Sequence, residues 1–359
     1  MPVSINGNLG ITFPDGSLQV AAASPFSLKN RIINGDMVIS QRNGTSSVTP
    51  TATTYTLDRW RTQISQASRL TIQQNAGSVT PPAGFTNYLG VTVASAYSIT
   101  ASDFFEIDQP IEGFNIADLA WGTANARTVT LSFWVRSSLT GTFGGSLIGA
   151  LAYPFTYTIS SANTWEQKTV TIPGPTTGTW TTNNGQGFTT VFSLGMGSDR
   201  TSTAGSWQSG NFLSATGATS VVGTNGATFY ITGVQLERNT TATPFEWIPY
   251  STELALCQRY FQPVLSATGA ASGATGLNLS VSYNSMRTDT PTFTTPSGFV
   301  TVTDWYATNT NTSSLPTWTI NVQIGNNSNI RTTNISGLTT ARPYGLSGGT
   351  GYIYAQAEL

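Results

Sequence analysis

Alternation between apolar and polar residues, broken at short intervals by turn residues, sets the strongest limit on the fold of this chain. The clearest strand is expected at residues 127–136, where four apolar residues share one face and Thr130, Ser132, Trp134 and Arg136 share the other. Further strands are expected at 69–73, 88–93, 104–107, 155–160, 166–172, 189–194 and 228–236. Since no helical crossover separates them, the sequence predicts an all-β fold, either a sandwich or a barrel.

The chain divides into four parts by composition and pattern. Residues 1–28 lack a helical period and are rich in turn residues, which predicts an extended segment that pairs with another chain or protein. Residues 29–249 carry the alternating pattern, 250–262 a short helix, and 263–359 a second β domain. Only six of the last 97 residues are charged, which is few for the surface of a monomeric domain. This predicts a surface shared between copies.

One helix is expected in the whole chain, within Ser251–Gln262. A serine or threonine can cap it, and Leu254, Cys257 and Phe261 recur at the spacing of one helix face. A helix this short is not stable alone, so the apolar face must be covered. Two arrangements are open: the three side chains form a trimer interface around a symmetry axis, or the helix caps a sandwich.

Charge and hydrophobic run length exclude two classes of partner. Charged residues make up 9% of the chain, and 15 basic residues against 16 acidic ones give a net charge of −1. Because nucleic-acid binding needs a basic surface to neutralise phosphates, no nucleic-acid partner is expected. No stretch is apolar over the roughly 18 residues of a membrane span, so no membrane insertion is expected either.

Catalytic chemistry has little support in the sequence. There is no histidine and a single cysteine, which removes imidazole-based catalysis, histidine-ligated zinc and a disulfide framework. The segment Gly345–Gly349 has the spelling of a nucleophile elbow, but no histidine is present to activate Ser347. We therefore expect a protein that is not an enzyme and that uses no cofactor.

Five acidic residues and no basic one lie between Asp103 and Asp118. Carboxylates suit Ca²⁺, and Asp103, Glu106 and Asp108 are the weak candidates for ligands, although no spacing matches an EF-hand loop. Ordinary ion pairing is the favoured alternative, because a basic cluster lies upstream. Its members are Lys29, Arg31, Arg42, Arg59, Arg61 and Arg69.

Four blocks of sequence resemble, in order, a module of bacteriophage tail-fibre and receptor-binding proteins. They are Arg31–Met37 with Ser40–Arg42, Leu57–Trp60, Phe105–Phe143 and Gly233–Glu237 with Thr243–Glu246. In addition, Gly10–Gly16 resembles repeats of fibre shafts and attachment segments, and the predicted helix is similar to the junction before a trimeric head. The last 97 residues carry no such resemblance.

The resemblance implies a jelly-roll β-sandwich similar to carbohydrate-binding modules, within a homotrimeric virion protein of the tail or fibre that is made in the host cytoplasm. It also implies that residues 1–28 attach to other virion proteins and that the chain binds a host surface polysaccharide or lipopolysaccharide during adsorption. The residues leave alternatives open: a purely structural collar, tail or head decoration, or a secreted carbohydrate-binding module. A depolymerase is less favoured, because such fibres usually need a long repetitive β-helix and no regular period is present.

Aromatic faces and hydrogen-bonding side chains are the candidates for contacts with a glycan. Trp134 and Arg136 share the polar face of the clearest strand, a face that the N-terminal segment or a neighbouring subunit could instead cover. The other candidates are Trp180 and Trp207 in loops, with packing at the end of a sandwich as the alternative, and Trp305, Tyr306 and Trp318 in the last domain, with a trimer core as the alternative.

Overall fold

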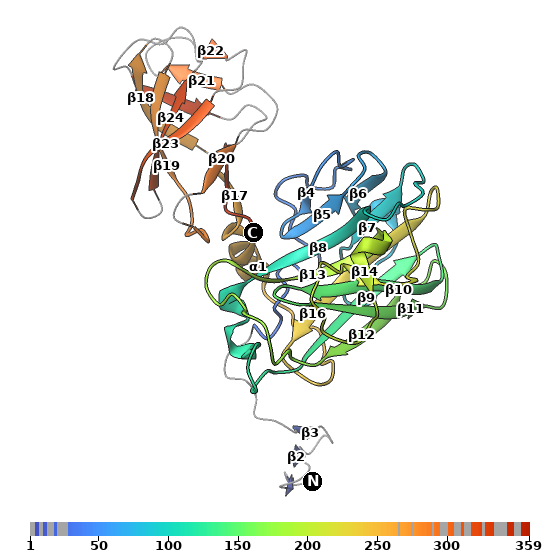
Figure 1. Ribbon diagram of the computed structural model, residues 1–359. Coiled ribbons are helices and arrows are strands. Elements are labelled where there is room, and N and C mark those ends of the chain that lie inside the picture. Colours follow the sequence, from blue (N-terminus) through green and yellow to red (C-terminus); the bar gives the residue numbers. More distant parts are fainter. Residues whose placement is uncertain are drawn as a thin grey trace.

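The structure is a computed structural model of the full chain. It describes residues 28–264 without a gap and, outside that range, the segments 4–6, 10–12, 18–19, 266–273, 276–288, 291–294, 301–304, 310–311, 317–324, 327–333, 343–347 and 353–359. Figure 1 shows a large β-rich body at residues 28–249, with the C-terminal strands beside it and the short strands β1 (Ser4–Asn6), β2 (Gly10–Thr12) and β3 (Leu18–Gln19) at the opposite end.

Two antiparallel sheets form the large body. The six-stranded sheet has the order β11 (Ala152–Ile159), β10 (Gly141–Ile148), β13 (Gln186–Met196), β8 (Phe104–Glu112), β5 (Trp60–Ile64) and β4 (Thr54–Leu57). The five-stranded sheet has the order β12 (Glu166–Ile172), β9 (Val129–Ser137), β16 (Thr228–Glu237), β7 (Leu89–Val93) and β6 (Leu70–Gln74).

The chain crosses repeatedly between these sheets, so that consecutive strands are often on opposite layers. From β8 it passes to β9 in the other sheet, returns for β10 and β11, crosses again for β12, and returns for β13. This is the connectivity of a jelly-roll sandwich. The prediction of an all-β jelly-roll sandwich is therefore confirmed.

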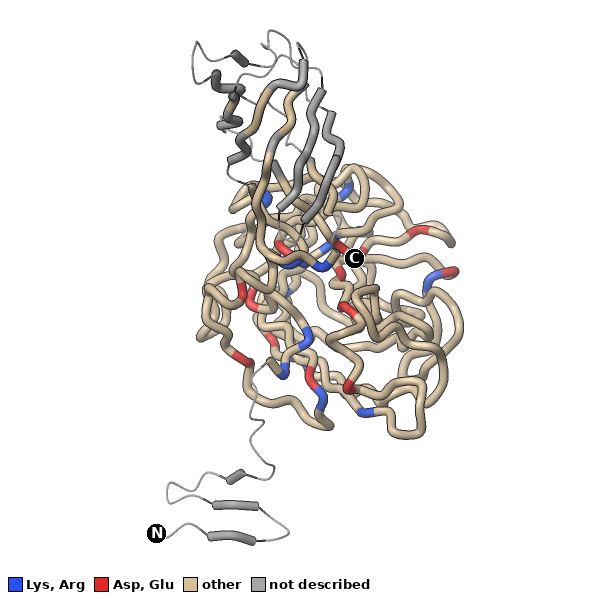
Figure 2. Tube along the Cα trace, turned by 90° about the vertical axis from the view of Figure 1, so that its left-hand side faces the viewer, with Lys and Arg blue, Asp and Glu red and all other residues tan. Residues whose placement is uncertain are grey.

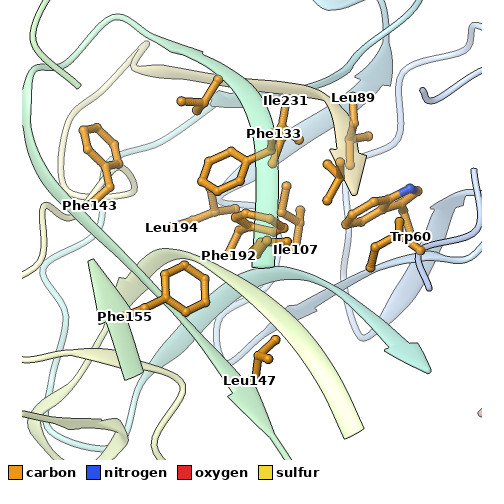
Figure 3. Packing of buried hydrophobic residues seen from close by; sticks show 14 of the residues in the cluster. Trp60, Leu89, Ile107, Phe133, Phe143, Leu147, Phe155, Phe192, Leu194 and Ile231 are labelled. Carbon is orange, nitrogen blue, oxygen red and sulfur yellow. The ribbon is translucent and has the colours of Figure 1, made fainter. Parts of the chain in front are cut away.

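The core lies between the two sheets and is rich in aromatic rings (Figure 3). Phe133 of β9 meets Phe192 of β13 edge to face, with ring centroids 5.0 Å apart. Trp60 is fully buried and tilts against Phe192 at 6.3 Å. The contact between Phe133 and Phe192 joins the two layers, because β9 and β13 belong to opposite sheets, whereas Trp60 and Phe192 lie in the same sheet.

The remaining elements of the described residues before residue 250 are short. They are the strands β1 (Ser4–Asn6), β2 (Gly10–Thr12), β3 (Leu18–Gln19), β14 (Thr201–Ser202) and β15 (Ser214–Ala215), and the 3₁₀ turns η1 (Ala76–Ser78), η2 (Gly113–Asn115), η3 (Ala117–Leu119) and η4 (Ser198–Arg200). Among the residues that the structure describes, no helix has the length and apolar character that crossing a membrane requires.

The single α-helix of the described residues, α1, spans Tyr250–Gln258 and ends earlier than expected. Phe261 lies in strand β17 instead, because the chain turns at Tyr260 and Pro263 cannot continue a helix. Cys257 is fully buried in a cluster with Ile33, Ile39 and Tyr260 of the same chain, and Leu254 packs partly against it.

The assignment of the helix face to a trimer interface is therefore corrected for two of its three residues. Cys257 and Phe261 are buried by their own chain, so their side chains are not available to another copy. The helix follows the other arrangement, in which it covers the sandwich body, since Ile33 and Ile39 belong to the segment that leads into the sandwich.

The C-terminal part of the chain forms two further sheets (Figure 1). The three-stranded one has the order β17 (Phe261–Val264), β26 (Ile353–Gln356) and β20 (Thr292–Thr294). The seven-stranded one has the order β22 (Thr310–Asn311), β21 (Thr301–Asp304), β25 (Pro343–Ser347), β18 (Ser266–Gly273), β19 (Gly276–Ser282), β24 (Asn327–Thr333) and β23 (Thr317–Ile324).

Candidate functional site

A polar pocket lies on the outer face of the six-stranded sheet. Along β8, Phe105 and Ile107 point into the core, so Glu106 and Asp108 point to the outer face. Antiparallel pairing with β5 places Arg61 opposite Asp108 and Gln63 opposite Glu106. Four polar side chains from two strands therefore meet on one face.

The pocket has a volume of about 190 Å³. Its buried residues include Glu106, Asp108 and Val191 of β13, while Gln186 and Asn211 are exposed. The volume is below the roughly 300–1,000 Å³ of pockets for drug-sized ligands, so it has room for one small ring or group of a larger ligand. None of the residues that line it is aromatic.

Arg61 and Gln63 hold the two carboxylates in place. Arg61 makes a bidentate contact with Asp108, from Nε to Oδ1 at 2.9 Å and from Nη2 to Oδ2 at 3.1 Å. The side-chain amide of Gln63 donates to Glu106 Oε1 at 2.9 Å and to Asp108 Oδ2 at 2.6 Å. Because one amide group serves both acids, the carboxylates of Glu106 and Asp108 lie close together.

The electrostatics of the two acids differ. Burial raises the pKa of Glu106 well above its ordinary value, and the negative charge of Asp108 raises it further, against the opposite effect of Arg61 and Gln63. In addition, Glu106 Oε2 is buried without a hydrogen-bond partner among the described residues. Apart from the interaction with Asp108, which raises the pKa of Glu106, the Oε2 atom has no partner among the described residues.

Asp103, the third candidate for a calcium ligand, is not part of this pocket. Its carboxylate accepts hydrogen bonds from Ser65 Oγ, Tyr97 Oη and both the backbone N–H and Oγ1 of Thr100, at 2.7–3.0 Å. Burial raises the pKa of Asp103, but these hydrogen bonds lower it more, so it lies below its ordinary value. Within the described part of the chain, no group of three acidic, histidine or cysteine side chains is placed to hold a metal ion.

The upstream basic cluster does form ion pairs with the acidic run, as expected. Arg61 pairs with Asp108, and Arg31 Nη2 lies 2.7 Å from Asp118 Oδ2. Another basic residue, Arg259 of the turn after α1, pairs with Glu112 at 2.6 Å. The acids between 103 and 118 thus have partners from several elements.

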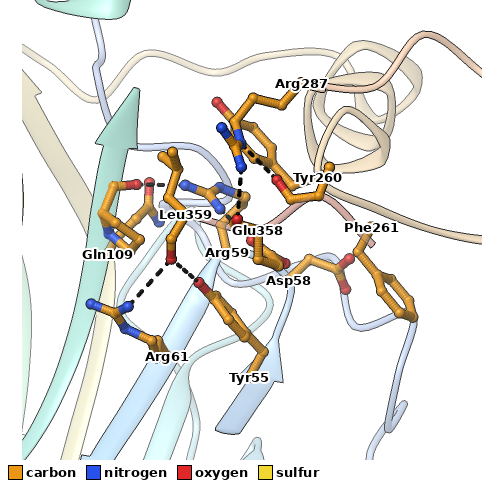
Figure 4. A network of polar contacts seen from close by, with 12 residues as sticks. Tyr55, Asp58, Arg59, Arg61, Gln109, Tyr260, Phe261, Arg287, Glu358 and Leu359 are labelled. Carbon is orange, nitrogen blue, oxygen red and sulfur yellow. Dashed lines mark hydrogen bonds and ion pairs between the residues drawn. The ribbon is translucent and has the colours of Figure 1, made fainter. Parts of the chain in front are cut away.

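A second polar network connects the sandwich to the last residues of the chain (Figure 4). Glu358 pairs with Arg42 at 2.9 Å and with Arg59 at 2.5 Å. The carbonyl oxygen of Leu359 accepts from Arg61 Nη1 and Tyr55 Oη, both at 3.3 Å. Figure 2 shows acidic and basic residues side by side in this region. Arg61 therefore contacts both the pocket acids and the C-terminal segment.

Trp134 and Arg136 lie on the outer face of the five-stranded sheet, away from the pocket. Trp134 is half-buried, and both it and Phe85 lie so close to Gly233 that a side chain at position 233 would collide with Phe85. Arg136 donates from Nε to the carbonyl oxygen of Asn163 at 3.0 Å. This face is partly covered, but by loops of the same chain.

Trp180 and Trp207 pack at one end of the sandwich. Their rings contact each other at 5.5 Å and Trp121 at 4.9 and 5.3 Å, respectively. Trp207 also donates from Nε1 to the carbonyl oxygen of Pro173 at 2.6 Å. The alternative of packing at the end of the sandwich accounts for both residues.

The three candidates in the last domain have no described side chains. Trp305 and Tyr306 lie outside the described residues. Trp318 lies in β23, but its side chain is also outside what the structure describes. Their assignment to a receptor surface stays a prediction.

Sequence reasoning missed the pocket as a unit. The sequence predicts Glu106 and Asp108 as members of an acidic run, with weak candidacy as calcium ligands or ordinary ion pairing as their roles, and no sequence pattern singles out Gln63. Because Glu106 and Asp108 are two residues apart in an expected strand, the sequence could have placed both acids on one face. Their meeting with Arg61 and Gln63, more than 40 residues earlier, depends on the pairing of β5 with β8.

No family model matches the sequence, and no curated protein matches it. Among solved structures, this chain is similar to a putative sugar binding protein from Bacteroides thetaiotaomicron VPI-5482, with 13% identity and a TM-score of 0.36 over 58% of this chain and 100% of that one. It is also similar to TmCBM61, solved in complex with β-1,4-galactotriose, with 11% identity and a TM-score of 0.31 over 58% of this chain and 99% of that one.

A further similar structure is the enzymatically active domain of tailspike protein 4 of bacteriophage CBA120. The identity is 14% and the TM-score 0.29, and the match covers 58% of this chain and 21% of the tailspike chain. Because these TM-scores are low, the functional assignment below rests on the pocket itself.

Proposed function

We propose that this protein binds a glycan in the pocket on the outer face of the six-stranded sheet. The observation that carries the proposal is the convergence of Arg61, Gln63, Glu106 and Asp108 on one shallow pocket. Carboxylate oxygens accept hydrogen bonds from sugar hydroxyls, and the exposed amides of Gln186 and Asn211 can both donate and accept. A rigid sheet positions these groups, as specific recognition of a polyhydroxylated ligand requires.

The role is binding rather than catalysis. Glycosidases place two carboxyl groups on either side of the bond that breaks. Here both acids come from one strand, and the same amide of Gln63 binds them side by side. Asp108 is also held by Nε and Nη2 of Arg61, which supports a role in positioning rather than in catalysis.

The biological setting that we assign is a phage appendage that contacts a host surface glycan. The support is the ordered series of sequence blocks between Arg31 and Glu246 that resemble receptor-binding modules, together with Gly10–Gly16. In this setting the N-terminal segment binds other virion proteins and the protein acts as a homotrimer. Three linked sites would raise the avidity of weak sugar binding.

The test compares two glutamines on the outer faces of the two sheets. Gln63→Ala removes the amide that orients both acids, whereas Gln167→Ala changes an exposed residue of β12 in the other sheet. On an array of bacterial surface polysaccharides, Gln63→Ala should weaken binding by about tenfold, since a hydrogen bond to a charged group is worth roughly 1.5–3 kcal/mol. Gln167→Ala should bind as the unaltered protein does.

The same pair of variants tests the phage setting in a binding assay with cells. Gln63→Ala should reduce attachment of the purified protein to host cells, while a cooperative thermal unfolding transition shows that the variant is folded even where the lost hydrogen bonds to two buried acids lower its melting temperature. Equal attachment by both variants would count against the pocket. If the unaltered protein attaches to cells but binds no glycan, the result would favour a structural virion protein that contacts a receptor of another kind.

A further inference from the structure

Charge in the pocket is unbalanced. Glu106 and Asp108 are 1% and 0% exposed, and the only basic residue among those that line the pocket is Arg61. Arg61 directs both of its contacts in the pocket to Asp108. The amide of Gln63 donates hydrogen bonds but carries no charge. One buried carboxyl group is therefore without a cation, and buried charges in proteins are normally paired or neutralised.

The geometry singles out Glu106 as the unpaired acid. Its Oε1 accepts from Gln63, but its Oε2 is buried and has no partner among the described residues. Glu106 lines the pocket, so its carboxyl group lies at the wall that a bound ligand faces. A ligand gains the most binding free energy where its donor binds a buried acceptor that has no other partner.

We propose that the glycan bound in this pocket carries an unsubstituted amine, as a hexosamine does, and that its ammonium group binds Glu106. The inference rests on the proposed function, because it names the substrate class of the same site. An ammonium group supplies three donors and the missing positive charge at once. A hydroxyl would satisfy the acceptor but not the charge, and a uronic acid would add a third negative charge.

The protonation of Glu106 agrees with this assignment. Its pKa is raised by burial and by Asp108, so in the empty pocket the carboxyl group stays neutral to a higher pH than usual. The other strands and loops that line the pocket contribute no titratable side chain. An ammonium group would compensate the charge and let Glu106 ionise, so binding should release a proton.

The experiment uses matched small sugars and the full-length protein. Glucosamine and galactosamine are compared with their N-acetyl derivatives, their parent hexoses and their uronic acids by ligand-observed NMR titration. The variants are Glu106→Gln, which keeps the shape but removes the charge, and Asp118→Asn, which changes an acid 42% exposed and outside the pocket. Thermal unfolding shows that each variant is folded.

The amino sugars should bind at least tenfold more tightly than their N-acetyl forms, and the uronic acids should bind most weakly. Glu106→Gln should abolish this preference while the parent hexoses still bind, and Asp118→Asn should keep it. Equal binding of amine and N-acetyl forms, or a preference that survives Glu106→Gln, overturns the inference. Ethanolamine tests the amine without a ring, and equal binding of ethanolamine overturns the assignment to a sugar.

The outcomes separate this inference from the proposed function. If the hexoses bind and Gln63→Ala weakens their binding, but no amine preference exists, only the inference fails. If no sugar of the panel binds to the unaltered protein, both fail.

Discussion

Arg59 and Glu358 form an ion pair that joins the start of the sandwich to the last residues of the chain. Arg59 Nη1 lies 2.5 Å from Glu358 Oε2, and the two side chains are 1% and 11% exposed. The guanidinium group also lies over the ring of Tyr260, 3.6 Å from its centroid, and donates to the carbonyl oxygen of Pro110. The pair therefore belongs to a buried network with Tyr260 and Pro110, in which Arg59 Nε has no hydrogen-bond partner among the described residues.

Removing the charge of Glu358 should destabilise this junction. Glu358→Gln leaves Arg59 buried without its anion, and breaking a buried pair costs about 3–5 kcal/mol. Urea unfolding followed by tryptophan fluorescence should show a loss of that order. The matched control is Asp118→Asn, which breaks the more exposed pair with Arg31 and should cost less than about 1 kcal/mol. Equal losses in the two variants would contradict a role for burial.

Glu253 should make the stability depend on pH. Burial, the hydrogen bond from the backbone N–H of Asn34, and the charges of Asp36 and Glu246 together set its pKa at about 7; burial is the largest cause and raises it, the hydrogen bond lowers it, and the two acids raise it. A raised pKa in the folded state means that its contribution is present in full below the unfolded pKa of about 4.5 and is lost as the pH rises through 7.

The corresponding variant is Glu253→Gln, which keeps an acceptor for Asn34 but cannot ionise. It should be more stable than the unaltered protein at pH 8, by up to about 3 kcal/mol, and close to it at pH 4.5. Urea unfolding at both pH values measures the difference. A pH profile identical to that of the unaltered protein would mean that Glu253 ionises freely in the folded state.

Cys257 should not react in the folded protein. The side chain is fully buried beside Tyr260, and burial raises its pKa well above the ordinary value, so the reactive thiolate is scarce. A thiol reagent at pH 8 should label none of the folded protein within minutes and all of it in concentrated urea. Rapid labelling without denaturant would show that α1 detaches from Ile33 and Ile39.

Trp207 should contribute to stability rather than to ligand binding. Its ring contacts Trp121, Trp180 and Tyr153, and its loss should cost about 2–3 kcal/mol, less than a fully buried tryptophan. Trp247→Ala is the control, since that ring is 55% exposed and packs on Phe85. A Trp207→Ala protein that unfolds normally but loses glycan binding would restore the binding role.

The sequence predicts well the strands in which apolar and polar residues alternate within the strand itself. Strand β12 has the bounds expected for it, and β9 buries Val129, Leu131, Phe133 and Val135 on one face. Strand β10 was missed because its glycines hide the alternation. A side chain at Gly145 would lie 2.3 Å from the carbonyl oxygen of Val191 and 2.5 Å from the ring of Phe155, so its role is visible only in the packed sheet.

The site was harder to predict than the fold because its members are distant in the sequence. Aromatic residues drew attention as candidates, but Trp180 and Trp207 complete the core at the end of the sandwich. Gln63 gains its importance only from lying opposite Glu106. Similarly, the helix pattern was recognised, but the cover of Cys257 by Ile33 and Ile39 depends on tertiary packing.

The pairing of β17 with β26 has a consequence for how this protein can diversify. The chain leaves the body at Val264 and comes back at Ile353, and these two residues are partners in adjacent antiparallel strands. Their Cα atoms are therefore about 5 Å apart. A domain inserted or exchanged between them would therefore begin and end at neighbouring points, and the body would keep its contacts with this segment if the exchange spared β20, which pairs with β26, and Arg287, which donates to the carbonyl oxygens of Ala357 and Glu358.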